Sequence, residues 1–140
     1  MIRKQPRQWQ QYLESTLKTL LESTAVTFAE MTPLMLPKRA GVYLITVINN
    51  GEEEPYYIGR TTNIRRRLYT NHLMGPTSNS QFKKYLIESG ECKDLEEAKQ
   101  FLRQFGKARW IEESNMRKRG AIEGYLTGVL FPKYGICQEH

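Results

Sequence analysis

The chain has 140 residues, of which 39% are hydrophobic and 26% charged, and its formal net charge at pH 7 is +6. This balance fits one folded domain with its own core and excludes an intrinsically disordered chain. The longest apolar run, "GVYLITVI" at residues 41–48, is far shorter than the ~20 residues of a transmembrane helix, and the basic N-terminus lacks the apolar segment of a secretory signal. We therefore expect a cytoplasmic protein with no membrane partner.

The N-terminal half of the chain is expected to form a helix followed by a β-hairpin. Apolar residues recur every three or four positions over residues 8–22, which predicts an amphipathic helix. A connector with two prolines and a glycine follows at 31–41. β-branched and aromatic residues then predict a strand at 42–48 that is covered on both faces. The sequence "NNGEEEP" predicts a turn, and "YYIGR" at 56–60 predicts a second strand that pairs with the first.

The C-terminal half is expected to contain four helices and a third strand. In chain order these are a helix at 64–72 capped by Thr62 or Asn63, a helix with a Ser78 and Gln81 capping box, a helix with an Asp94 and Glu97 capping box, a strand at 107–112, and a last helix at about 119–130 that follows a basic loop. The order predicts a small α/β sandwich with a three-stranded, mostly antiparallel sheet flanked by helices.

Basic residues are clustered, whereas acidic residues collect elsewhere at 52–54 and 96–97. This separation favours a polyanionic partner such as nucleic acid. The clustered cations fall into three groups: Arg60, Arg65, Arg66 and Arg67; Arg117, Lys118 and Arg119; and Arg3, Lys4 and Arg7.

The predicted last helix carries glycines at every fourth position, 120, 124 and 128. Because an interior glycine costs ~1 kcal/mol relative to alanine, we expect these glycines to pack the helix closely against the sheet, with Val129 among its inward-facing residues. Glu123 lies beside that face, so its carboxylate is expected to be partly desolvated and to favour a cation.

The predicted hairpin brings aromatic and basic residues together. Tyr57 and Gly59 share one face of their strand, and Tyr43 shares it if the register allows. Arg67 follows on the next helix, where its guanidinium group can bind two phosphate oxygens at once. Gly59 is expected to let a large ligand approach the backbone closely.

These segments carry a family resemblance. The triplets "GVY" at 41–43 and "YIG" at 57–59, an arginine eight positions after Gly59, and the segment "AIEGYLTGVLFPKYG" resemble the GIY-YIG nuclease family over about residues 40–135. The resemblance implies a GIY-YIG-type fold and a metal-dependent endonuclease that cuts phosphodiester bonds. It divides the chain into an N-terminal helical extension packed on the core, residues 1–36, and a GIY-YIG nuclease-like domain, residues 37–140.

The resemblance also implies roles for single residues. Tyr43 and Tyr57 would position or deprotonate the attacking water, Arg67 would stabilise charge on the phosphate, and Glu123 would bind one Mg²⁺ or Mn²⁺ ion. A tyrosine base has an unperturbed pKa of ~10, so we hypothesise that arginine and metal charges lower the pKa. The candidate nucleic-acid contacts are Arg60, Arg65, Arg66, Arg117, Lys118 and Arg119.

Two positions depart from the family pattern. Relatives have a histidine or tyrosine four positions after the arginine, where this chain has Asn71, and an asparagine where it has Gly135. His72 follows Asn71, but at ~100° per residue it lies ~140° from Arg67 around an α-helix, so it reaches the site only if the helix has ended.

We expect a metal-dependent endonuclease that acts on nucleic acid, with DNA as the expected substrate and no obligate protein partner. The alternative is a nonenzymatic nucleic-acid-binding module with a degenerate nuclease site, which Asn71 and Gly135 favour. A third hypothesis, an adaptor that dimerises through the glycine-rich helix, explains the glycines but not the cluster of arginines and tyrosines.

Overall fold

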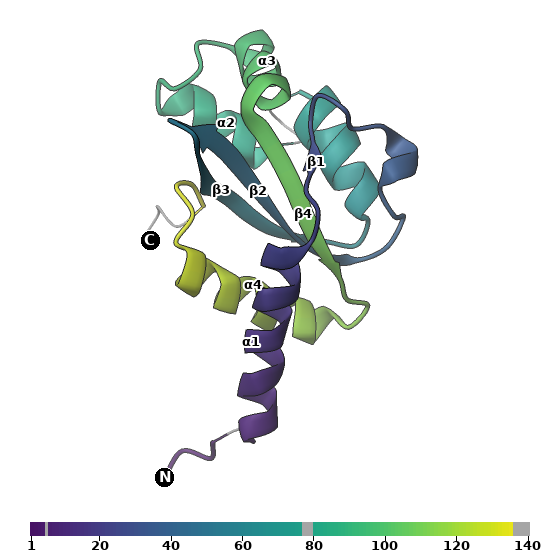
Figure 1. Cartoon of the computed structure of the whole chain (residues 1–140), viewed down its shortest axis with the longest axis vertical. Helices are drawn as coiled ribbons and strands as arrows, with labels where there is room; N and C mark the ends of the chain where they lie inside the picture. Colours follow the sequence, from purple (N-terminus) through teal and green to yellow (C-terminus); the bar gives the residue numbers. More distant parts are fainter. Residues whose placement is uncertain (5, 77–79, 136–140) are drawn as a thin grey trace.

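Four antiparallel strands form the centre of the protein, which we describe from a computed structural model covering residues 1–4, 6–76 and 80–135 (Figure 1). The strand order is β1-β4-β2-β3, so β3 lies at an edge. The elements are α1 (Arg7–Glu22), β1 (Val26–Thr27), the 3₁₀ turn η1 (Pro33–Met35), β2 (Gly41–Asn49), β3 (Glu52–Thr61), the π-helix η2 (Arg66–Met74), α2 (Gln81–Glu88), α3 (Leu95–Phe105), β4 (Gly106–Glu112) and α4 (Met116–Leu130).

The sheet confirms the predicted α/β class and its antiparallel pairing but has one strand more than expected. The additional strand, β1, has two residues, and Val26 pairs with Ala108 of β4. Two residues are too few for side-chain alternation to be recognised in a sequence. The predicted boundary between residues 1–36 and 37–140 therefore falls between two strands of one sheet, and we propose that the extension folds together with the domain.

Helices cover both faces of the sheet. One face packs against η2, α2 and α3, in a core that includes Tyr43, Ile45 and Phe82. The other face packs against α1 and α4, in a core that includes Val42 and Ile122. Neighbouring residues of β2 thus serve opposite cores, as the predicted doubly covered strand requires. Among the described residues, no helix combines the length and the apolar character that crossing a membrane requires.

The hairpin of β2 and β3 is longer than the sequence predicted. Its turn consists of Asn50 and Gly51, whose φ angles are 52° and 80°, a left-handed pair that favours a tight two-residue connection. Residues 52–55, which we expected in the turn, belong to β3. The register shifts once, because Ile45 pairs with Tyr57 whereas Thr46 pairs with Pro55. Tyr56 therefore forms a β-bulge.

The helix expected at 64–72 is present, but it is wound as a π-helix from Arg66 to Met74. Hydrogen bonds in such a helix run from residue i to i+5, whereas those of an α-helix run to i+4. Residues five apart therefore lie near one another on the same face. The rotation of ~100° per residue assumed from the sequence was wrong for this helix.

Three other helices begin where side chains cap them. The Asp94 carboxylate accepts the Glu97 N–H at 2.9 Å, which confirms the predicted start of α3. Helix α2 is capped by Ser80, whose hydroxyl oxygen accepts the Lys83 N–H; Ser78, the residue we expected to cap it, lies outside the described residues. Asn115 caps α4, so the predicted basic loop is in fact the first turn of that helix.

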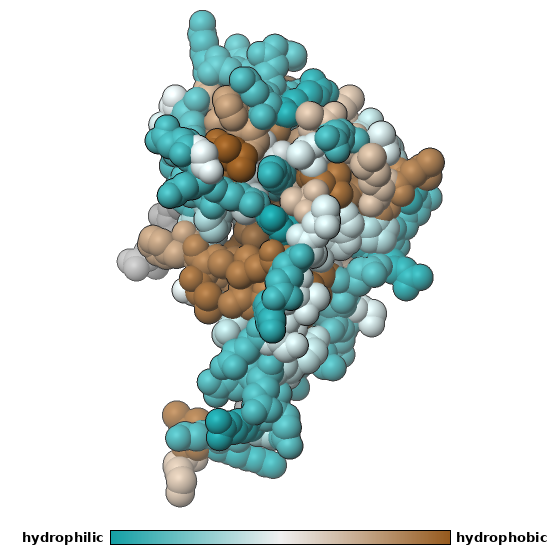
Figure 2. All heavy atoms as spheres, in the orientation of Figure 1, coloured by the Kyte–Doolittle hydropathy of each residue, from teal (hydrophilic) through white to brown (hydrophobic). Residues whose placement is uncertain are grey.

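The prediction that the α4 glycines pack against the sheet holds for Gly120, where an added Cβ atom would lie 2.5 Å from Arg60 Nη1 of β3, but it was wrong for Gly124 and Gly128. A Cβ atom added to Gly124 or Gly128 would meet nothing within 4 Å, whereas Ile122 and Leu126 on the opposite face are fully buried. Val129, expected inside, is 51% exposed. Figure 2 shows apolar side chains gathered on the surface where α4 lies beside α1.

Candidate active site

Tyr43 of β2 and Gly59 of β3 lie directly opposite each other in the hairpin. The Tyr43 ring crosses over Gly59, so that a Cβ atom at position 59 would lie 2.3 Å from the Tyr43 hydroxyl oxygen. Tyr57 is on the same face, with its ring centroid 6.3 Å from that of Tyr43, which confirms the predicted shared face. The space at Gly59 is filled by Tyr43 itself, not by a ligand as the sequence suggested.

Replacing Gly59 with alanine is therefore expected to force Tyr43 out of its position. Tyr43 is fully buried, and overpacking of such a core typically costs roughly 1–3 kcal/mol of unfolding free energy. Urea denaturation measures this loss. Gly128→Ala is the matched control: its Cβ meets nothing, and alanine should stabilise the helix by up to ~1 kcal/mol. Equal effects of the two substitutions would contradict the assigned contact.

The π-helix brings His72 to Tyr43. His72 Nε2 lies 2.7 Å from the Tyr43 hydroxyl oxygen, and Arg67 Nε donates to the same oxygen at 3.3 Å. His72 is five positions after Arg67, so the π-helical winding places both on the side of the helix that faces the hairpin. The expectation that His72 reaches the site only beyond the end of the helix was wrong.

Ser80 is a member of this network that we did not predict. Its hydroxyl oxygen lies 2.7 Å from His72 Nδ1, and Ser80 is as fully buried as His72. The chain of contacts therefore runs from Ser80 through His72 and Tyr43 to Arg67. A serine before a helix can be recognised in a sequence as a candidate cap, but its contact with His72 cannot be.

Burial keeps the side chains of this network neutral, apart from Arg67. Desolvation raises the pKa of Tyr43 and of Tyr57, and the neighbouring Arg67 charge opposes it only in part. Desolvation, with the charges of Arg67 and Lys83, holds the pKa of His72 well below its ordinary value. Without a metal ion, the pKa values of both tyrosines are thus raised, whereas we hypothesised that they are lowered.

Glu123 projects from α4 at the edge of the sheet that β3 forms. Desolvation raises the pKa of its carboxyl group, and Arg60 opposes the rise. Glu123 Oε1 lies 3.7 Å from Arg60 Nε, a long ion pair. The negative charge of Glu123 raises the pKa of both Tyr43 and Tyr57, so the carboxylate is close enough to influence both hydroxyl groups. The Arg60 backbone also hydrogen-bonds this carboxylate, and a partly desolvated carboxylate favours a further cation.

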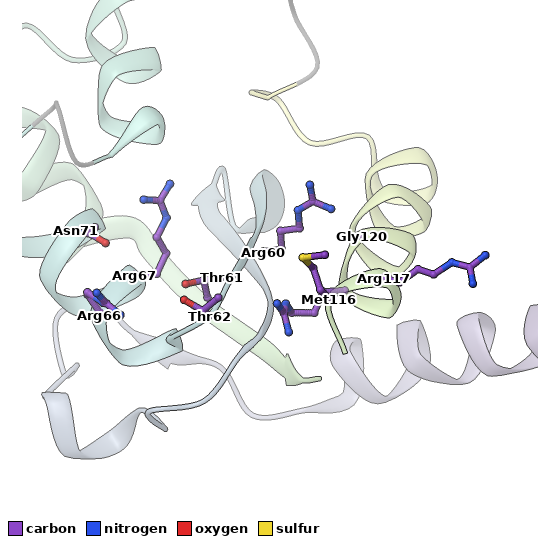
Figure 3. Close-up of a pocket in the computed structure, with 10 residues that line it drawn as sticks. Arg60, Thr61, Thr62, Arg66, Arg67, Asn71, Met116, Arg117 and Gly120 are labelled. Atoms are coloured by element: carbon purple, nitrogen blue, oxygen red, sulfur yellow. The ribbon is translucent and has the colours of Figure 1, made fainter. Parts of the chain in front are cut away.

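A cleft of about 1060 Å³ spans the end of β3 between η2 and α4. Figure 3 shows Arg67 and Arg60 projecting in similar directions on either side of Thr61 and Thr62, whereas Arg117 points away from both. The cleft is lined by Arg60, Thr61, Thr62, Arg66, Arg67, Asn71, Met116, Arg117, Arg119 and Gly120. Its concentration of guanidinium groups suits a phosphate-rich ligand.

The six arginines and lysines expected to contact nucleic acid differ in their surroundings. Arg60, Arg66 and Arg117 line the cleft. Arg65 Nε donates to the Leu36 carbonyl oxygen. The buried Arg119 also lines the cleft, but its guanidinium donates to the carbonyl oxygens of Glu113 and Ser114. The last, Lys118, has its Nζ 5.8 Å from the centre of the Tyr12 ring.

The two departures from the family pattern both lie at the site. Asn71 lines the cleft beside Arg67. Gly135 lies against Tyr57, where an added Cβ would be 3.6 Å from the ring, and its φ of 102° favours glycine. Backbone hydrogen bonds tie this segment to the bulge, because the Tyr134 N–H donates to the Tyr56 carbonyl oxygen at 2.9 Å.

A sheet-edge cleft lined by arginines, with tyrosines and a glutamate beside it, defines a protein built to bind and cut a phosphodiester. Comparison with known families agrees, because the model of the GIY-YIG catalytic domain matches residues 39–126, more than half of the chain. The chain belongs to the GIY-YIG family, and it is an endonuclease.

Solved structures that are similar to this chain include the GIY-YIG N-terminal endonuclease domain of UvrC from Thermotoga maritima. The magnesium-bound form is 27% identical, with a TM-score of 0.47, and the match covers 74% of this chain and 91% of that one. A point mutant bound to the catalytic divalent cation is 26% identical, with a TM-score of 0.47 and coverage of 74% and 90%. No curated protein matches the chain.

Proposed function

We propose that this endonuclease hydrolyses phosphodiester bonds of DNA and requires one Mg²⁺ or Mn²⁺ ion. The observation that supports this most directly is that Arg67 lines the cleft at the end of β3, and that Arg67 and the partly desolvated Glu123 both lie close enough to Tyr57 for their charges to shift its pKa. Fixed positive charge and a carboxylate for a hard cation are what a phosphoryl transition state requires.

Glu123 would hold the ion. Within the described ranges no group of three or more His, Cys, Asp or Glu side chains could do so. A single carboxylate suffices for Mg²⁺, which keeps several waters and accepts oxygens of the substrate. When bound, the ion supplies Lewis acidity and lowers the pKa of a coordinated water. The Arg60 guanidinium, whose Nε lies 3.7 Å from Glu123 Oε1, is the cation that a bound ion would have as its neighbour.

Arg67 would bind the scissile phosphate, and Tyr43 would hold Arg67 in place. Because Ser80 Oγ accepts the Lys83 N–H, the Ser80 hydroxyl hydrogen can donate to His72 Nδ1, which leaves Nε2 as the protonated nitrogen. His72 and Arg67 then both donate to the Tyr43 oxygen. In this role His72 is a buried, neutral support for Tyr43 and does not act as a base.

Tyr57 is the tyrosine that we assign to the attacking water. It is only partly buried, whereas Tyr43 is fully buried; Arg67 contacts both tyrosines, and Tyr43 is engaged by His72 as well. Since burial raises the pKa of Tyr57, its neutral hydroxyl group would orient the water, and removal of a proton would depend on cationic charge brought by the metal ion.

The test is cleavage of labelled single-stranded, duplex, flapped and branched DNA, together with RNA of the same forms, in Mg²⁺, Mn²⁺ or EDTA. We expect cleavage of DNA that requires the metal and ceases in EDTA. Cleavage in EDTA would contradict the metal requirement, and a preference for RNA would contradict the DNA assignment. Salt-sensitive binding of every substrate without cleavage would identify a nonenzymatic binding module.

A further inference from the structure

The first two turns of α1 extend beyond the core of the protein (Figure 1). Leu13, Leu17 and Leu20 of this helix belong to the core between α1, α4 and the sheet, but Trp9 and Tyr12 do not. These two rings stack on each other instead, with centroids 5.2 Å apart and planes inclined by 18°. Figure 2 shows mainly hydrophilic side chains around this part of α1.

A second cavity, of about 370 Å³, lies between Trp9 and the first turns of α4. It is lined by Trp9, Asn115, Arg117, Lys118 and Ala121. Cavities that bind small ligands begin at ~300 Å³, so a nucleobase fits this space. One wall offers an aromatic ring, and another offers two cations. Glu113, the carboxylate beside Tyr12, already accepts hydrogen bonds from the Tyr12 hydroxyl and the Asn115 N–H.

Arg117 joins this cavity to the active-site cleft, because it lines both. Figure 3 shows its side chain pointing away from Arg60 and Arg67. The N-terminal end of α1 extends the positive charge further, since residues 1–13 contain Arg3, Lys4 and Arg7 and no acidic residue. A polyanion that leaves the cleft past Arg117 therefore meets a surface of complementary charge.

We propose that Trp9, Arg117 and Lys118 form a subsite for an unpaired nucleotide of the substrate strand that flanks the bond to be cut. The base stacks in the cavity against Trp9, and its phosphate lies between Arg117 and Lys118. Stacking on an aromatic side chain requires an exposed base face, which an unpaired nucleotide has and a base inside a duplex lacks. The proposal rests on the proposed nuclease function, but it concerns substrate binding outside the catalytic residues.

The tryptophans make this subsite directly measurable. The chain has two, Trp9 and Trp110, so Trp110→Phe leaves Trp9 as the single tryptophan, whose emission is excited selectively at wavelengths that tyrosine does not absorb. We would titrate this variant in EDTA with a hairpin duplex that ends in a four-nucleotide single-stranded extension, and with the same hairpin ended bluntly, as DNA and as RNA. We expect saturable quenching of Trp9 by the extended hairpin and none by the blunt one. Equal quenching by both, or none by either, would overturn the proposal.

Affinity measurements in the otherwise unchanged protein provide a second test that does not depend on Trp110→Phe folding. Fluorescence anisotropy of labelled hairpins should show that Trp9→Ala weakens binding of the extended hairpin about 5- to 100-fold and leaves the blunt one unchanged. Trp9→Phe should retain most of the affinity. The control for the loss of one positive charge is Lys84→Ala, which removes a cation that pairs with Glu88 on α2. Arg117→Ala should weaken binding of the extended hairpin more than Lys84→Ala does.

The two proposals fail in different ways. Metal-dependent cleavage with no selective effect of Trp9→Ala on the extended hairpin would overturn the subsite and leave the nuclease function intact. A selective effect of Trp9→Ala without cleavage of any substrate would support the subsite and contradict the proposed function. Since binding is measured in EDTA, neither result depends on turnover.

Discussion

Replacing Glu123 with glutamine is expected to reduce the rate of metal-dependent cleavage by about 10³-fold or more. The amide keeps the shape of the side chain but loses the charge that we assign to the metal ion, whose stabilisation of a phosphoryl transition state is worth several kcal/mol. Each 1.36 kcal/mol corresponds to about a factor of ten in rate. The fold should persist, because the ion pair of Glu123 with Arg60 spans 3.7 Å and its arginine is 55% exposed; such pairs contribute little to stability.

Initial rates and direct metal binding should be measured on the same preparations. Calorimetric titration of the protein with Mn²⁺ should show that Glu123→Gln loses the ion, whereas Glu88→Gln binds it as the unaltered protein does. Glu88 is a suitable control because its carboxylate pairs with Lys84 on the surface of α2. Unchanged affinity for Mn²⁺ in Glu123→Gln would exclude Glu123 as the ligand.

Substitution of Arg67 by lysine is expected to lower kcat about 10²- to 10³-fold, the loss that follows removal of one preorganised donor to a transition state. Arg67 Nε donates to the Tyr43 hydroxyl oxygen, and its side chain lines the cleft in which we propose that the phosphate binds. A lysine keeps the positive charge but has no planar fork of donors. Affinity for the substrate should therefore change far less than kcat does.

Arg66→Lys is the matched control, because Arg66 is the adjacent residue and lines the same cleft. Its effect should be confined to a small, salt-dependent change in affinity. Single-turnover kinetics at saturating protein separate binding from cleavage. If the two lysine variants lost the same fraction of activity, Arg67 would have no special place in the reaction.

Strong local patterns in the sequence correctly predicted most of the fold. The alternation of the hairpin strands placed Tyr43, Tyr57 and Gly59 on one face, and the hydrogen bond from the Glu97 N–H to Asp94 confirmed the predicted helix cap. These features depend on residues that are close in sequence or on a register that a short turn fixes. They are the features that a single sequence specifies best.

Features that depend on distant contacts were not predictable. The π-helical winding of η2 leaves no local signature, and it decides whether His72 or Asn71 lies on the side of Tyr43. Cationic residues that are adjacent in the sequence also have different surroundings: Arg66 lines the cleft, whereas Arg65 donates to the Leu36 carbonyl oxygen. A cluster of like charges in a sequence therefore predicts a kind of partner, but tertiary packing decides which members face that partner.

The outward direction of Gly124 and Gly128 on α4 was missed for a related reason. Their four-residue spacing suggests a contact, but spacing alone does not say which side of a helix meets the sheet. Here the buried side belongs to Ile122 and Leu126, and Gly124 and Gly128 are on the open side. Larger side chains at these positions would therefore be tolerated by the core.

The bulge at Tyr56 divides the β2–β3 hairpin into two segments with separate alignments. In the segment that adjoins the helices, the pairing of Tyr43 with Gly59 must stay fixed. The other segment, from Thr46 to Pro55, carries the turn. A change in its length can be absorbed at the bulge, so that the change does not alter the pairing of Tyr43. This end of the hairpin is thus the place where a foreign loop, such as a peptide tag or an added recognition element, can be grafted with the catalytic arrangement left intact.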